Sequence, residues 1–92
     1  MATYFLFGKY SLDAVKAISA KRTDKAVTLI KQNGGELKAG YALLGDIDLV
    51  LIVDLPDTER AMKTSAALST QLGISFTTAP AVSMADFDKL MG

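Results

Sequence analysis

The sequence predicts an α+β domain in which strands and helices follow the order βαββαβ. Two strand-like stretches, Glu36–Leu44 and Asp48–Asp54, are separated only by the short turn Gly45-Asp46, which indicates an antiparallel hairpin. A segment with apolar residues at helical spacing lies on each side of this hairpin. One further strand-like stretch precedes the first of these segments, and another follows the second. With right-handed crossovers, this order gives the ferredoxin-like architecture: a four-stranded antiparallel sheet with two helices on one face.

The first strand and the first helix are predicted from their residue types. Thr3–Tyr10 is rich in aromatic residues, which favour strands. Ser11 follows it, and a serine in this place caps a helix by accepting a hydrogen bond from a free amide. Because the periodic apolar residues after it are interrupted by a polar stretch, we expect a helix over Ser11–Asn33 that is kinked or broken near Ser19–Arg22. Gly34-Gly35 ends this helix, since glycine adopts the left-handed conformation of a C-cap.

The two strands of the hairpin differ in pattern. In Glu36–Leu44 the apolar residues alternate, and we expect one face to hold Leu37, Ala39, Tyr41 and Leu43. In Asp48–Asp54 both faces are apolar, with Leu49, Leu51 and Val53 on one and Val50 and Ile52 on the other. The pattern alone does not decide which of these faces meets the helices.

An apolar open face predicts self-association. The helices cover one side of such a sheet, and a monomer would make the other side polar. Here neither side of the central strands is polar, and each large apolar side chain left in water forgoes about 1.5–3 kcal/mol of burial. We expect a homodimer or a higher oligomer formed through the sheets, and the alternative is that the tail helix folds over the open face.

The second half of the chain contains a helix, a last strand and a helical tail. Pro56-Asp57 begins the helix Thr58–Leu72, with Asp57 as its cap and Gly73 as its end. Its expected inward residues are Ala61, Met62, Leu68 and Leu72. The strand Ile74–Val82 contains Pro80, which cannot donate to a ladder and therefore belongs at an edge or a bulge. Ser83 then caps a short helix in the tail, residues 83–92, and one domain spans residues 1–92.

Composition excludes several kinds of chemistry. The 92 residues include no cysteine and no histidine, which removes disulfides, thiol nucleophiles, the commonest general base and the usual ligands of zinc and haem. We therefore expect no metal site and no cofactor. The formal net charge is zero, so no excess positive charge draws the protein to nucleic acid or to anionic lipid. No apolar run reaches the roughly 18 residues of a membrane span, and no secretory signal is visible, so we expect a cytoplasmic protein.

The candidate binding residues are Asp48, Tyr41, Lys38, Arg22 and Tyr10. Asp48 opens an apolar strand, where a carboxylate needs water, a backbone amide or a cation such as Lys38 or Arg22 as its partner. Tyr10 and Tyr41, together with Tyr4, can line an apolar pocket with hydroxyl groups or simply pack at an interface. Asp46, in the turn, is expected to make local backbone hydrogen bonds.

At the hairpin the sequence resembles the GYD domain family of small bacterial and archaeal proteins, whose functions are largely unknown. The similarity covers nearly the whole chain and rests on Leu44–Asp48 with Leu49–Val53, Met1–Tyr4, Lys21-Arg22, Gly34-Gly35, Lys38, Tyr41, Pro56-Asp57 and Phe87. Ile47 departs from the pattern, because the family has a tyrosine there. The resemblance implies a ferredoxin-like fold that pairs into a dimeric α/β barrel, and it transfers no established chemistry.

These observations favour a small-molecule binding or sensing module. Two alternatives stay open: a cofactor-free enzyme of the oxygenase or isomerase kind, and a purely structural interaction module. RNA binding is disfavoured, although RNA recognition motifs share this strand order and stack bases on aromatic residues of the sheet. The segment Asp48–Ile52 is acidic and then aliphatic, whereas that motif needs a basic, aromatic-rich strand there.

Overall fold

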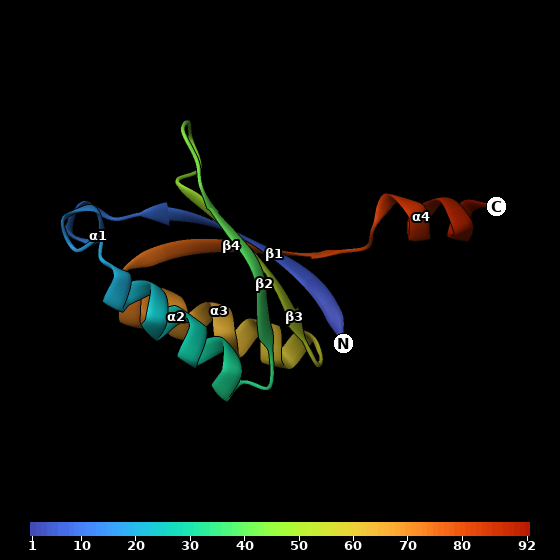
Figure 1. Ribbon diagram of the computed structural model, residues 1–92, viewed down its shortest axis with the longest axis horizontal. Coiled ribbons are helices and arrows are strands. Elements are labelled where there is room, and N and C mark those ends of the chain that lie inside the picture. Colours follow the sequence, from blue (N-terminus) through green and yellow to red (C-terminus); the bar gives the residue numbers. More distant parts are fainter.

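The computed structural model describes residues 1–92 (Figure 1). In chain order the elements are β1 (Ala2–Tyr10), α1 (Leu12–Lys16), α2 (Ala20–Gln32), β2 (Glu36–Ala42), β3 (Leu49–Leu55), α3 (Thr58–Leu72), β4 (Ile74–Ala81) and α4 (Met84–Met91). The four strands form one antiparallel sheet in the order β2-β3-β1-β4, and α2 and α3 lie on the same face of it. This arrangement confirms the predicted ferredoxin-like fold. Each strand end lies within two residues of the predicted one.

The hydrophobic core lies between the sheet and the two covering helices. On β3, Leu51, Val53 and Leu55 face the helices, which decides the question that the apolar pattern of this strand left open. The core residues come from β1, β3, α2 and α3: Tyr4, Leu6, Ala26, Leu29, Ile30, Leu51, Val53, Leu55, Ala61 and Leu68. Burial of the large side chains in this layer is the main stabilising contribution to the fold.

The face predicted for β2 is wrong because the strand contains a β-bulge. Leu37 pairs with Val53, whereas Ala39 pairs with Ile52, and the register shifts between these two pairs. A bulge inserts one residue, so side chains on its two sides point to opposite faces of the sheet. Leu37 therefore faces the helices, while Ala39 and Tyr41 lie on the open face. The strand ends at Ala42.

The first helical segment is broken, as predicted, and the break lies slightly earlier than expected. α1 ends at Lys16, and α2 begins at Ala20 with Ser19 as its N-cap. The Ser19 hydroxyl accepts a hydrogen bond from the Arg22 amide at 3.3 Å, which satisfies one of the free donors of the first turn of α2. The break lets α2 pack as a separate helix against the sheet.

The bounds and caps of α3 agree with the sequence prediction, but one of its expected core residues is exposed. Asp57 accepts a hydrogen bond from the Arg60 amide at 2.8 Å, and Gly73 ends the helix with a φ of 69°. Ala61 and Leu68 are buried as expected, whereas Met62 is 67% exposed and does not point inward. The buried residues of α3 are Ala61, Thr64 and Leu68, which recur at helical spacing along one stripe, and Met62 lies outside this stripe.

The open face of the sheet is apolar at its centre. Phe5 and Phe7 lie on it with ring centroids 6.1 Å apart, and they pair with Ile52 and Val50 of β3. The tail helix does not cover this face, because α4 projects beyond the end of the sheet (Figure 1). None of the helices combines the length and the hydrophobicity needed to cross a lipid bilayer.

Two neighbouring positions on β3 test which face is the core. We expect Leu51→Asp to abolish cooperative unfolding, because a charge without a partner would sit in the core at a cost of roughly 3–5 kcal/mol. Ile52→Asp places the same charge on the open face and should keep the helical circular dichroism spectrum of the parent protein. Thermal melting of both variants checks this, and equal melting temperatures would contradict the face assignment.

Candidate functional site

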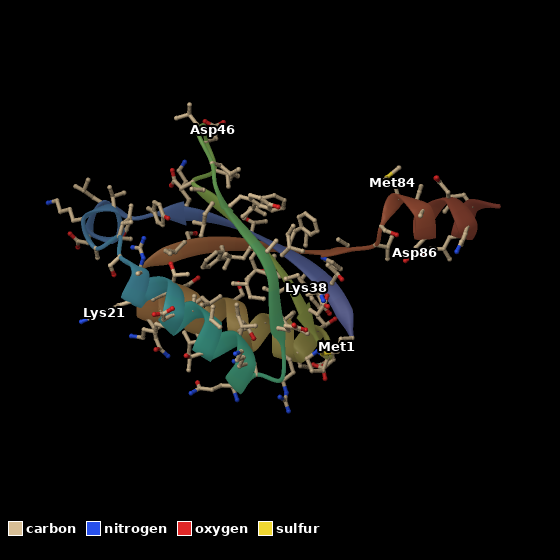
Figure 2. All side chains as sticks on the ribbon, in the orientation of Figure 1. Met1, Lys21, Lys38, Asp46, Met84 and Asp86 are labelled. Atoms are coloured by element: carbon tan, nitrogen blue, oxygen red, sulfur yellow. The ribbon has the colours of Figure 1, made fainter.

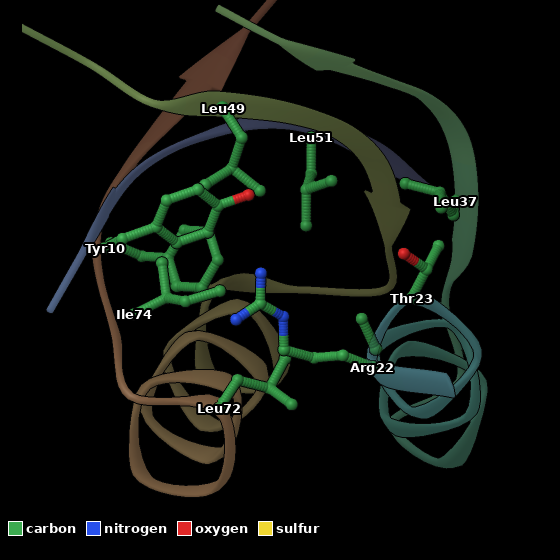
Figure 3. A pocket seen from close by; sticks show the side chains of 10 residues that line it. Tyr10, Arg22, Thr23, Leu37, Leu49, Leu51, Leu72 and Ile74 are labelled. Atoms are coloured by element: carbon green, nitrogen blue, oxygen red, sulfur yellow. The ribbon is translucent and has the colours of Figure 1, made fainter. Parts of the chain in front are cut away.

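A hollow between α2 and the sheet, here called the sheet cleft, is the candidate binding site. It consists of a cavity of about 70 Å³ and an adjoining open part of about 420 Å³, with Tyr10, Thr23, Leu37, Leu49 and Leu51 lining both. The smaller cavity is also lined by Arg22, Ala26, Leu72, Ile74 and Phe76 (Figure 3). Apolar walls with a few polar groups are typical of small-molecule sites.

The backbone of β1 shapes the inner wall of the sheet cleft. Gly8 occupies a position on the helix-facing side, where a Cβ atom would lie 2.5 Å from Leu49 Cδ2 and 2.8 Å from Phe76 Cε1. Side chains from the two neighbouring strands therefore close over the glycine. The bulge in β2 completes the opposite wall, because it directs Leu37 toward the helices.

Arg22 is the charged residue of the sheet cleft. Its guanidinium extends from the first turn of α2 into the space between the sheet and the helices, with Leu49 and Leu51 on one side and Leu72 on the other (Figure 3). It lies 4.9 Å from the centre of the Tyr10 ring, which is a cation–π contact. Nη1 also donates a hydrogen bond to the Ala14 carbonyl, and this bond links α1 to α2.

The Arg22 guanidinium has donors to spare. An arginine side chain offers five N–H groups, and the only hydrogen bond that this side chain makes in the protein is to Ala14. The ion pairs of the protein are those of Lys38, so no carboxylate neutralises Arg22. A cation among apolar walls, without a carboxylate partner, is suited to an anionic group of a ligand.

Asp48 is held by the backbone of β1. Its Oδ2 accepts a hydrogen bond from the Tyr10 amide at 2.8 Å, and its own amide donates to the Gly8 carbonyl at 2.9 Å. Its carbonyl accepts from the Leu43 amide at 2.8 Å. Of the three partners considered for this carboxylate, the structure supplies the backbone amide. Asp48 therefore joins the base of the hairpin to the end of β1 that carries Tyr10.

The other candidate residues, Lys38 and Tyr41, make no contact with Arg22. Lys38 forms ion pairs with Asp54 at 3.6 Å and with Glu36 at 3.9 Å, at the end of β3 opposite to Asp48. Tyr41 borders the open part of the sheet cleft but pairs with Val50 on the open face and is 60% exposed. Asp46 lies at the tip of the hairpin, away from Lys38 (Figure 2). Tyr10 thus contacts Arg22 through its ring and Asp48 through its backbone amide, whereas Lys38 pairs with other residues.

The sequence pattern did not predict several of the residues that line the sheet cleft. Thr23, Leu72, Ile74 and Phe76 line the cleft although no motif distinguishes them. Leu72 and Ile74 flank Gly73, which turns the chain from α3 into β4. Their apolar character indicated burial, but only the packing of this turn beside α2 shows that they share a cavity with Arg22.

Three comparisons with known proteins add to this description. The family model of the GYD domain matches residues 4–91. Comparison with curated proteins gave no match. Among solved structures, the leucine response regulatory protein of Mycobacterium tuberculosis superposes with a TM-score of 0.60 at 11% identity, over 90% of this chain and 51% of that one. A second structure, described only as a glutamate-to-alanine mutant, gives a TM-score of 0.59 at 12% identity with the same coverage.

The chain therefore spans about half the length of the solved structures that it matches, with 51% of each covered. At these identities the similarity shows the fold alone. The order of strands and helices that this chain shares with the two solved structures does not specify which side chains line a site.

The hydrogen bond of Asp48 leads to a stability prediction. We expect Asp48→Ala to lower the free energy of unfolding by about 1–3 kcal/mol, because the Tyr10 amide loses its acceptor. Asp48→Asn should lower the free energy of unfolding by less, since the amide oxygen of asparagine still accepts this hydrogen bond, although without a negative charge. Urea unfolding measures both changes. Asp46→Ala, in the exposed turn, is the control and should stay within about 0.5 kcal/mol of the parent; an equal loss in both alanine variants would contradict the assignment.

Proposed function

The chain belongs to the GYD domain family, and from the geometry of its sheet cleft we propose that it is a small-molecule binding or sensing module. The observation on which this proposal rests is the Arg22 guanidinium, which extends between apolar walls without a carboxylate partner. Bringing a cation into such surroundings costs solvation free energy, and the contacts with Tyr10 and Ala14 offset only part of that cost. A bound anion would supply the missing partner.

The ligand class follows from the lining of the cleft. We infer a small organic acid whose hydrocarbon part lies against Leu37, Leu49 and Leu51 and whose carboxylate accepts hydrogen bonds from Arg22. The open part of the cleft, about 420 Å³, is in the range that holds small ligands. Similarity of fold to a protein described as a leucine response regulatory protein supports a sensing role, since leucine has both an aliphatic part and a carboxylate.

Self-association is the second part of this proposal. Phe5, Phe7 and Ile52 are half-buried and lie on a face that no element of the same chain covers, and apolar surface left open in this way marks interaction sites. A second copy of the chain presents a face of the same shape and character. Two such faces packed together would form a closed arrangement with the helices outside, as the family resemblance implies.

The ligand proposal is tested with a matched pair of probes. We expect 4-methylpentanoate to bind and 4-methylpentanamide to bind about 10–100-fold more weakly. The amide lacks the negative charge of the carboxylate, whose hydrogen bonds with a charged group such as Arg22 contribute about 1.5–3 kcal/mol. Isothermal titration calorimetry measures the affinities of both probes, and of leucine as a third ligand. Native mass spectrometry of the purified protein shows whether a ligand is retained.

A pair of variants distinguishes binding at Arg22 from a general electrostatic attraction of the ligand to the protein. Arg22→Gln should lose the preference for the carboxylate over the amide, whereas Lys25→Gln, an exposed position in the same helix, should keep it. Both substitutions remove one positive charge, so a general effect of charge would reduce the preference for the carboxylate equally in the two variants. If neither the parent nor the Lys25→Gln variant prefers the carboxylate, the proposed ligand class is wrong.

The mass in solution tests self-association. We expect light scattering at micromolar concentration to give at least twice the 9.8 kDa of one chain, because burial of the open face favours association. A mass of one chain across this range of concentrations would exclude association through the sheet.

A further inference from the structure

The C-terminal arm, residues 82–92, carries an amphipathic helix, α4, that buries no residue against its own chain. None of the residues of α4 is buried, and Met84, Leu90 and Met91 are 73%, 72% and 69% exposed. Met84 and Asp86 extend from opposite sides of the helix (Figure 2). Together with Phe87, these three apolar residues recur at intervals of three, four and seven, which places them on one side of a helix.

A helix of this length requires packing to be stable. α4 has eight residues, and isolated helices shorter than about 12–15 residues are marginal in water. Its ends are well formed, since the Ser83 hydroxyl accepts a hydrogen bond from the Asp86 amide at 3.0 Å and Lys89 lies in the last turn. Such a cap contributes about 1 kcal/mol, which does not offset the cost of helix nucleation. The apolar side of α4 therefore needs a surface.

The direction of the chain takes α4 away from its own sheet. β4 is an edge strand that ends at Ala81, opposite Thr3 at the start of β1. Ser83 continues in an extended conformation, with φ of −64° and ψ of 156°, so the chain does not turn back over the open face. The protein is consequently elongated, with extents of 48 × 30 × 18 Å and α4 at one end of the long axis.

The open face alone is small for a stable interface. It holds about half of the residues of strands with 9, 7, 7 and 8 residues. A standard interface uses roughly 20–30 residues on each side. Adding the arm brings the interaction surface of one chain into that range. A hollow of about 270 Å³ lies where the arm leaves the sheet, lined by Thr3, Phe5, Ala81, Val82 and Ser83.

We propose that the arm is exchanged between two copies of this chain. Each α4 packs its apolar side against the other copy, with Phe87 seated in the hollow at the base of the partner's arm, next to Ala81. In a two-fold symmetric pair the contact is made twice, because each copy supplies one arm and one hollow. The exchange rests on the self-association proposed above and adds to it a specific contact that the sheets alone do not provide.

The absence of cysteine allows a clean cross-linking test. A tagged chain with Phe87→Cys is co-expressed with an untagged chain with Ala81→Cys, and a mild oxidant is added. We expect a disulfide between the tagged and the untagged chain on a non-reducing gel. In the matched control, Asp88→Cys replaces Phe87→Cys, and this position on the polar side of α4 should give at least several-fold less of the linked product.

A second measurement uses the association constant. Phe87→Asp should weaken dimerisation at least tenfold in light-scattering or sedimentation experiments, whereas Asp88→Ala should leave it unchanged. Because α4 buries no residue on its own chain, the circular dichroism spectrum of the rest of the protein should persist in both variants. An oligomer without the 87–81 link, or one that Phe87→Asp leaves unaffected, would overturn the exchange but not self-association. A monomeric parent protein would overturn both.

Discussion

The sheet has two faces, and the chain can cover only one of them. α2 and α3 lie on the side where β1 and β3 present Leu6, Leu51 and Val53, and together they enclose the hydrophobic core. β1 and β3 are the central strands, so their other sides, with Phe5 and Phe7, remain open to solvent within one copy. The core, the proposed pairing of copies and the projecting arm all follow from this division of the sheet.

The sheet cleft depends on two interruptions of regular structure. The break between α1 and α2 places Arg22 in the first turn of a separate helix, from which its guanidinium reaches the Tyr10 ring and the Ala14 carbonyl. The bulge in β2 directs Leu37 to the same space. A continuous helix and a regular strand would each have given these residues different orientations. Asp48 then holds the end of β1, which positions Tyr10 beside Arg22.

The proposed ligand site and the proposed assembly surface lie on opposite sides of the sheet. Arg22 and the apolar lining of the cleft are on the side of the helices, whereas Phe5, Phe7 and the base of the C-terminal arm belong to the open side. Gly8 and its neighbours on β1 contribute to both sides, because alternate residues of one strand point in opposite directions. A ligand that shifted β1 or β3 would therefore also move the surface that we propose meets a second copy.

The order of the elements and most of their ends could be predicted from the residues alone, because these depend on local chemistry. Ser11, Asp57 and Ser83 cap the helices that follow them, and a run with two apolar faces marks a central strand. Four features could not be predicted in this way: the bulge in β2, the outward direction of Met62, the hydrogen bond from the Tyr10 amide to Asp48 and the position of Arg22 in an apolar cleft. Each of these outcomes depends on strand register or on contacts between residues far apart in the chain, and such contacts leave no periodic signal in the sequence.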